Sequence, residues 1–395
     1  MPDTVTSIGE AAFNGCNSIT DITLPFVGES PSASYTEYGV LGYIFGYLVE
    51  YSDTIENMVL QYSKHSQGRD YYFYYHIPNT LRNVNITTQT AIPNYAFRNC
   101  SFIETITISS AVTIGYHAFR NCSNLKSIAI PESVTAILDN AFSGCNKLGG
   151  VYITDVEAWC NLSFSTEESN PLVYAKLLYL NDELLSNLII PDGIASIKYY
   201  AFYNCTSIKN VYIPATVTSI GYKAFCGCTN IIRINSLADG ELILPNGITK
   251  IYTQAFQGLE HITKVVVPDT VTSIGEAAFN GCNSITDITL PFVGESPSAS
   301  YTEYGVFGYI FGYSVSNSAD GEDGVVQYEI SNWKGSTYYY YNIPKNMRNV
   351  IITSQTAIPN YAFRNCSFIE TITVKSNTSF GIDALNNCNA TIKYI

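Results

Sequence analysis

Basic residues and histidines are scarce in this sequence. Its 395 residues include 20 lysines and arginines against 33 aspartates and glutamates, and only four histidines. An acidic chain of formal charge −13 without a basic stripe argues against nucleic acid and anionic membrane surfaces as partners. No apolar run reaches the roughly eighteen residues that a membrane-spanning helix needs, so we expect no transmembrane segment in this chain.

Catalytic and cofactor motifs are also missing. The histidines are scattered, and no H-E-x-x-H, G-x-S-x-G, G-x-G-x-x-G or Walker pattern occurs. Acidic pairs such as Glu167-Glu168 fall in predicted loops, where solvated side chains are the simpler interpretation. We therefore expect no enzyme, no cofactor and no metal site; an enzyme site inside a large turn is the least favoured alternative.

A repeated segment dominates what is present. The stretch Pro131–Ile153 follows the pattern P-x-x-V-T-x-I-G-x-x-A-F-x-x-C-x-x-L-x-x-I-x-I with few deviations. A fixed period of this size predicts a solenoid, because one repeat cannot bury its own apolar face without neighbours. The same pattern begins again, with its proline, at Pro2, Pro191, Pro214, Pro245 and Pro268.

Each repeat predicts one turn with two apolar sides. Leu148, Val151 and Ile153 alternate as in a short strand that faces the solenoid core, while Gly150 and Tyr152 point outward. Stacking would align these strands into a parallel sheet. On the other side of the turn, the spacing within 141–145 favours one turn of helix that buries phenylalanine and cysteine.

The repeat resembles the BspA-type leucine-rich repeat. Its hallmark is matched by Ile213 to Phe225 followed by Cys228, and the segments Phe307–Gly312 and Trp159–Phe164 resemble that family's irregular units. The resemblance implies an α/β, right-handed leucine-rich-repeat solenoid with a parallel β-sheet on one face and short strands or helical turns on the other. The right-handed crossover of parallel strands favours the same hand.

The organisation indicates one repeat domain over residues 1–395. Residues 2–107 recur at 268–373 with a constant offset of 266, which a recent block duplication explains. The offset stays constant even where the two copies differ in sequence. This is expected if the fold fixes the number of residues in the segment while residues at the tip of a surface loop can change freely. Irregular long turns are expected near 25–80, 154–184 and 291–346.

The eleven cysteines do not predict a disulfide framework. Equivalent positions in stacked turns lie ~5 Å apart, so distance alone does not exclude disulfides, but side-by-side thiols in the core are the favoured interpretation. Cys226-Gly227-Cys228 has metal-ligand spacing without a second pair nearby, so a metal there is not favoured. Nine cysteines share one repeat position: Cys16, Cys100, Cys122, Cys145, Cys205, Cys228, Cys282, Cys366 and Cys388.

The surplus of 32 tyrosines has two interpretations. Tyrosines could fill gaps around oversized turns, or they could provide binding surface, since tyrosine offers large contact area at low entropic cost. The expected candidate surface lies on the outer face of the sheet, unless the 154–184 turn covers it. It would be an apolar stripe with polar neighbours, formed by Tyr152, Ile189, Tyr212, Asn210 and Arg233.

The resemblance implies a non-enzymatic interaction or adhesion protein. BspA-like proteins are associated with bacterial adhesion to host matrix proteins and to other cells, so protein or glycan ligands on host matrix or cell surfaces are expected. An extracellular or cell-surface location follows, with signal peptide and anchor expected outside the given sequence. The alternative is a structural spacer or stalk that projects other modules of a larger surface protein.

Overall fold

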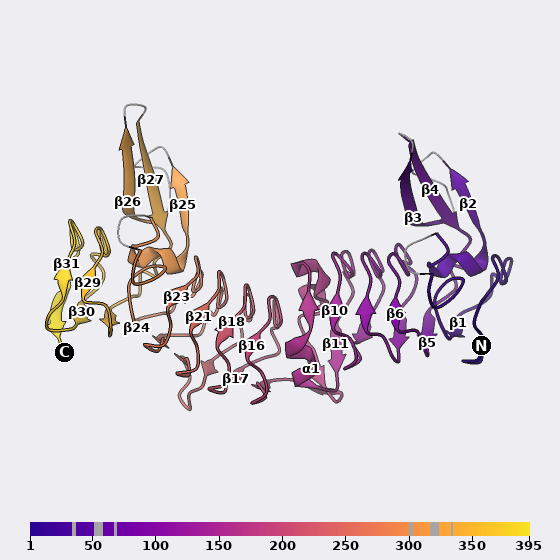
Figure 1. The fold of residues 1–395 in the computed structure, drawn as a ribbon, viewed down its shortest axis with the longest axis horizontal. Helices are drawn as coiled ribbons and strands as arrows, with labels where there is room; N and C mark the ends of the chain where they lie inside the picture. The colour runs from indigo at the N-terminus through magenta and orange to yellow at the C-terminus, as the bar shows by residue number, and fades with distance from the viewer. Residues whose placement is uncertain (34–36, 51–57, 67–68, 300–302, 317–323, 333–334) are drawn as a thin grey trace. The chain divides into compact units, whose positions relative to one another are not determined.

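The computed structural model describes two compact units, Met1–Leu185 and Ser186–Ile395, each a stack of solenoid turns (Figure 1). Together they comprise about 13 turns. The structure describes residues 1–33, 37–50, 58–66, 69–299, 303–316, 324–332 and 335–395. Parts of the expected long turns 25–80 and 291–346 therefore lie outside the described residues, and the single-domain organisation and the hand of the coil stay predictions.

The first unit is built on a seven-stranded main sheet whose strands are parallel except the last. Alternation of side chains turns Val84, Ile106 and Ile128 into the core. In spatial order the strands are β1 (Asp21–Leu24), β5 (Asn83–Ile86), β7 (Thr105–Ile108), β9 (Ser127–Ala129), β11 (Gly150–Ile153), β13 (Leu178–Leu180) and β14 (Glu183–Leu184).

A second sheet of two-residue parallel strands closes the same turns on their other side. Ile92, Ile114 and Ile137 from these strands are buried against the main sheet's inner face. The strands are, in order, β12 (Ser163–Phe164), β10 (Ala136–Ile137), β8 (Thr113–Ile114) and β6 (Ala91–Ile92).

The second unit repeats this design with a nine-stranded parallel main sheet. Its strands are β15 (Asn187–Ile189), β17 (Asn210–Tyr212), β19 (Arg233–Ile234), β20 (Glu241–Ile243), β22 (Lys264–Val266), β24 (Asp287–Leu290), β28 (Asn349–Ile352), β30 (Thr371–Val374) and β32 (Thr391–Tyr394). The opposite side carries β16 (Ser196–Ile197), β18 (Ser219–Ile220), β21 (Lys250–Ile251) and β23 (Ser273–Ile274), and the separate pair β29 (Ala357–Ile358) and β31 (Ser379–Phe380).

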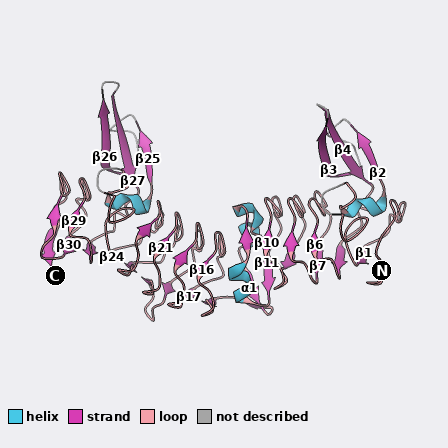
Figure 2. Cartoon of the chain, in the orientation of Figure 1, coloured by secondary structure: helices cyan, strands magenta, loops and turns pink. Residues whose placement is uncertain are grey.

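Each unit also carries a three-stranded antiparallel arm that projects from the stack (Figure 2). The first arm follows the 3₁₀ helix η1 (Leu41–Phe45) and contains β2 (Tyr47–Glu50), β4 (Arg69–Tyr75) and β3 (Val59–Ser66). The second follows η3 (Phe307–Phe311) and contains β25 (Tyr313–Ser316), β27 (Gly335–Tyr341) and β26 (Val325–Asn332). The tyrosine-rich runs of the sequence form the central strands of these arms.

One buried glutamine fastens each arm to the stack. In the first arm, the register of β3 shifts between Leu60 and Tyr62, and this bulge turns Gln61 into the core. Its Oε1 accepts from the Gly42 amide at 2.6 Å, and its Nε2 donates to the Ala96 carbonyl at 3.1 Å. Gln61 therefore satisfies buried backbone groups where the arm interrupts the regular turns.

The core of the regular turns consists of stacked rings beside buried thiols. Phe202, Phe225 and Phe256 stack with centroids 5.3 and 5.8 Å apart. The Cys228 thiol donates to the Phe202 carbonyl of the preceding turn at 3.0 Å. All eleven cysteines are free, and nine of them are buried. The prediction that the repeated cysteine position lies in the core is wrong for Cys16, which is exposed, and for Cys388, which is partly exposed.

The helical turn expected over Ala141–Cys145 is instead a pair of β-turns. The amide of Ser143 donates to Asn140, and that of Cys145 to Phe142, three residues back in each case. Asn140 and Gly144 have φ values of 54° and 80°, a left-handed conformation that interrupts a helix and that asparagine and glycine adopt readily. Asparagine or glycine precedes the conserved cysteine position in turn after turn for this reason.

Within the expected long turn 154–184, the chain rejoins the main sheet at β13, earlier than the sequence suggested. The helix α1 (Val156–Asn161) begins at Asp155, whose carboxylate accepts from two amides of the first turn. Two further short helices, η2 (Glu167–Ser169) and α2 (Leu172–Ala175), then lead into β13. This segment is one complete solenoid turn followed by the β13–β14 hairpin.

We predict that most thiols react only after unfolding. Burial raises the pKa of Cys145 and Cys282 to about 12, so the reactive thiolate is rare in the folded protein. Titration with a thiol reagent should label Cys16, and Cys388 more slowly, in the native protein. In denaturant without reductant it should label all eleven. A smaller count in denaturant would show disulfides and contradict the core described above.

We also predict that Gln327→Leu destabilises the second unit by ~1–3 kcal/mol. Gln327 accepts from the Gly308 amide at 2.6 Å and donates to the Ala362 carbonyl at 2.9 Å, so leucine would leave both buried groups unsatisfied. Chemical denaturation monitored by tyrosine fluorescence should show a lower midpoint. Gln61→Leu should act equally on the first unit, whereas unchanged midpoints in both variants would show that the glutamines do not anchor the arms.

Candidate functional site

An exposed depression lies on the outer face of the second unit's main sheet, over its first three strands. It has a volume of about 370 Å³. Strand pairing places Ile189 beside Tyr212 and Asn210 beside Arg233, so four of the five predicted surface residues meet here. The lining consists of Asn187, Leu188, Ile189, Asn210, Val211, Tyr212, Arg233, Asn235, Ser236 and Leu237. We call this feature the apolar depression.

Side-chain alternation explains why the apolar depression is exposed. Leu188 and Val211 point inward and are buried, which forces Ile189 and Tyr212 outward. Ile189 is 65% exposed and Tyr212 52% exposed, so no described turn of the second unit covers them. Neighbouring apolar side chains left in water are the usual composition of a contact surface.

Leu237 completes the depression and was not anticipated from the sequence. It is fully exposed, on the loop that follows β19. The loop is fixed because the Ser236 hydroxyl donates to Glu241 at 2.5 Å and accepts from the Ala238 amide at 3.1 Å. An aliphatic residue within the polar run Ser236–Gly240 is the signal that could have revealed it.

Some polar side chains of the depression already form ion pairs or hydrogen bonds within the protein. Arg233 forms an ion pair with Asp239 at 2.8 Å, which balances its charge. The Asn210 amide donates to Asn187, whereas its Oδ1 is buried and accepts no hydrogen bond among the described residues. The depression therefore offers apolar contact and amide hydrogen bonding and has little net charge of its own.

Tyr152 does not join this group, so the expected stripe of Tyr152, Ile189 and Tyr212 is not formed. Tyr152 is on β11, whose neighbour is β13 in the first unit's main sheet, and its cross-strand partner is Tyr179. The two rings stack with centroids 4.6 Å apart and planes 10° apart. The stripe is not formed because the chain returns to the sheet at β13, earlier than expected. Tyr179 of β13 therefore occupies the position beside Tyr152 at which the sequence suggested Ile189.

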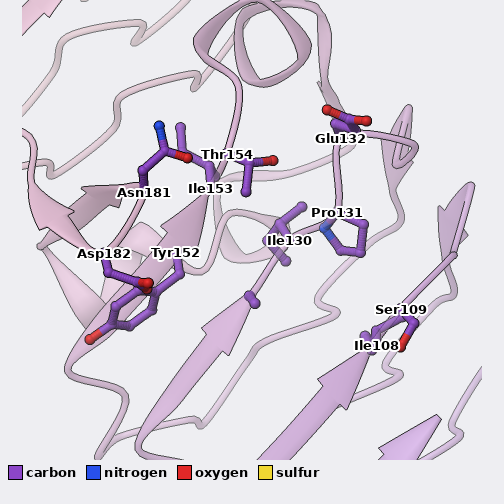
Figure 3. Close-up of a pocket in the computed structure, with 11 residues that line it drawn as sticks. Ile108, Ser109, Ile130, Pro131, Glu132, Tyr152, Ile153, Thr154, Asn181 and Asp182 are labelled. Carbon is purple, nitrogen blue, oxygen red and sulfur yellow. The ribbon is translucent and has the colours of Figure 1, made fainter. Parts of the chain in front are cut away.

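Tyr152 lines a separate, larger depression of about 530 Å³ in the first unit (Figure 3). Its rim includes Glu132 and Asp182 with hydrophobic Ile130 and Ile153 between them. Asp182 follows Asn181 in the two-residue β13–β14 turn, and both have positive φ, as such a turn requires. This rim is acidic, in contrast to the apolar depression of the second unit.

The two depressions differ in their charged groups: carboxylates line the first-unit depression, and one arginine lines the apolar depression. Their lining residues include no histidine and no cysteine. Among the described residues, no group of three or more histidine, cysteine, aspartate or glutamate side chains is placed to hold a metal ion. No described helix is long and apolar enough to cross a membrane.

Short parallel strands, stacked phenylalanines and one turn per repeat define a leucine-rich-repeat solenoid. The BspA type leucine rich repeat region matches this chain in six copies, over residues 1–32, 48–169, 176–292 and 333–395. The chain therefore belongs to the BspA-type leucine-rich-repeat family. This family is one of bacterial surface repeat proteins, and leucine-rich-repeat solenoids generally serve as non-enzymatic scaffolds for protein interaction.

Solved bacterial structures with leucine-rich repeats resemble the chain. A leucine-rich repeat protein from Bacteroides ovatus is 20% identical, with a TM-score of 0.49 over 87% of this chain and 81% of that chain. A leucine rich cell surface protein from Faecalibacterium prausnitzii is 23% identical, with a TM-score of 0.39 over 86% of each chain. No curated protein matches the chain.

Proposed function

We propose that this protein is a non-enzymatic interaction protein at the cell surface or outside the cell, and that it binds host proteins, glycans or other cells. The apolar depression is the proposed contact site, with Ile189, Tyr212 and Leu237 as anchors and Asn210 and Arg233 at its polar edge. The main observation behind this proposal is that Ile189, Tyr212 and Leu237 are all exposed around one concave surface.

The composition of the depression supports binding in preference to a spacer role. Contact surfaces concentrate their energy in aromatic and aliphatic anchors within a concave patch, surrounded by polar groups. A spacer needs only a soluble surface, and three exposed apolar side chains oppose solubility.

Tyr152 belongs to the proposal as a second, separate contact. It stacks on Tyr179 over Gly150, where an added Cβ would lie 3.0 Å from both rings. The missing Cβ at Gly150 therefore leaves room for the two stacked rings. A stacked pair of partly exposed tyrosines suits contact with a sugar ring or with another aromatic group.

The test is a triple variant, Ile189→Ser, Tyr212→Ala and Leu237→Ser. These side chains are exposed, so the melting temperature should change little, while binding to matrix proteins or whole cells should weaken at least about tenfold. Binding can be measured on immobilised extracellular matrix proteins and on host and bacterial cells.

Matched control variants distinguish loss of the proposed site from a general loss of exposed apolar surface. Val315→Ser with Ile382→Ser removes exposed aliphatic groups elsewhere in the same unit and should leave binding unchanged. Tyr152→Ala with Tyr179→Ala tests the first unit's stacked pair alone. Binding that survives all these changes would contradict the proposal and favour the structural spacer.

A further inference from the structure

A cluster of aromatic and cationic side chains lies where the first arm joins the regular turns, and none of its members lines either depression. It draws on β3 of the arm and on the turns that follow β6 and β8, next to one another in the stack (Figure 1). We call it the arm-base cluster. Its members are Tyr62, Tyr95, Arg98, Tyr116, His117 and Arg120.

Tyr95 is the centre of the cluster. Its ring meets the edge of Tyr62 at 5.7 Å and of Tyr116 at 5.4 Å between centroids. The Arg98 guanidinium lies 5.4 Å from the same ring. His117 stacks on Tyr116 at 3.7 Å, and Arg120 contacts the His117 Nε2 at 3.4 Å. Aromatic faces and guanidinium groups are thus held side by side.

Within the described part of the chain, no ion pair neutralises the two arginines of this cluster. Among the described residues, Arg98 has no carboxylate partner and no side-chain hydrogen bond, and its Nε is buried without a partner. The one side-chain hydrogen-bond contact of Arg120 among the described residues is with His117. A guanidinium normally recruits carboxylates, and this chain has 33 acidic residues available, so two unpaired arginines in one place are unexpected.

The local electrostatic field agrees with this geometry. Burial, and then the charges of Arg120 and Arg98, lower the pKa of His117 to about 4, and the charge of Asp139 in the adjacent turn opposes this shift with a smaller effect. Burial and the Arg120 charge likewise lower the pKa of Arg98. The cluster is therefore a positive site on an acidic protein.

The duplicated half provides an internal comparison. Tyr328, Tyr361 and Arg364 reproduce the geometry of Tyr62, Tyr95 and Arg98: the two tyrosine rings lie 6.3 Å apart and the guanidinium 5.6 Å from Tyr361. There, however, Arg364 pairs with Glu329 of the second arm at 3.5 Å. The equivalent of Glu329 in the first arm is Ser63, which cannot neutralise Arg98.

Three more substitutions remove the cluster from the second half. Ile382, Asp383 and Asn386 occupy the positions of Tyr116, His117 and Arg120. The second copy thus keeps the aromatic and arginine scaffold but is neutral or acidic around it. The anchoring of the two arms is the same, because Gln61 and Gln327 make the same contacts in their own copies.

We propose that the arm-base cluster binds the acidic group of an anionic glycan, a carboxylate or a sulfate ester. Arg98 and Arg120 belong to adjacent turns, ~5 Å apart, a spacing that lets two guanidinium forks share one oxyanion. The neighbouring tyrosine rings can stack on sugar faces, which favours an acidic saccharide over a bare anion. This surface would act in addition to the apolar depression.

The first experiment measures binding of a short oligogalacturonate and of a sulfated oligosaccharide by calorimetry on the whole protein. Arg98→Gln and Arg120→Gln should each weaken binding at least about tenfold, as expected for loss of a charge-assisted hydrogen bond. Arg364→Gln is the matched control and should bind like the parent protein. Equal loss in Arg364→Gln, or none in Arg98→Gln, would overturn the proposal.

A second variant avoids removing any side chain of the cluster. Ser63→Glu recreates the ion pair that Glu329 makes in the second half, so it should keep or raise the melting temperature while abolishing glycan binding. Retained binding in Ser63→Glu would overturn the proposal. Neutral oligosaccharide of equal length should not bind. Equal binding of polyglutamate or of free sulfate would show a general anion site and overturn the assignment to glycans.

Discussion

Every feature of this protein depends on one constraint: a single turn cannot bury its own apolar face. Each inward side chain must therefore find its partner in the next turn, as Phe202 does with Phe225 at 5.3 Å. The cysteine position fills the space beside the ring and also donates to a carbonyl, as Cys228 does to Phe202. Leu259 fills the same position without a donor, so close packing is the shared requirement and the thiol hydrogen bond is an addition.

The arms show how an insertion of this size leaves the stack intact. The 3₁₀ helix η1 takes the place of a regular turn: the Phe13 amide donates to Ile44 at 2.8 Å, and the Leu41 amide donates to Ala96 at 2.9 Å. Gln61 then satisfies the groups that a regular turn would have paired. Beyond this base the arm strands pair mainly with each other, so their sequence can change at little cost to the solenoid.

The solenoid could be predicted from the sequence because its determinants are local and repeated. The alternation around Val151 and the recurring Phe142 and Cys145 positions each reappear in the structure as expected. The candidate site was harder to predict because it depends on which strands become neighbours. Tyr179 meets Tyr152 only because β13 joins the sheet early, and Leu237 lies beside Tyr212 only through the geometry of one short loop.

Which of the two arm bases has a neutralised arginine could not be predicted from the sequence either, because this too depends on strand register. A bulge at Gln61 shifts the register of β3 by one residue, and that shift decides which side chain of the arm faces Arg98. The bulge is the same in both copies, so the exchange of Ser63 for Glu329 adds a carboxylate beside the arginine of the second arm base, and the three further exchanges at Tyr116, His117 and Arg120 change the surrounding surface. Duplication thus gave two arm bases the same anchoring contacts but surfaces of different charge, and the shared stacking of the turns lets the two surfaces diverge independently.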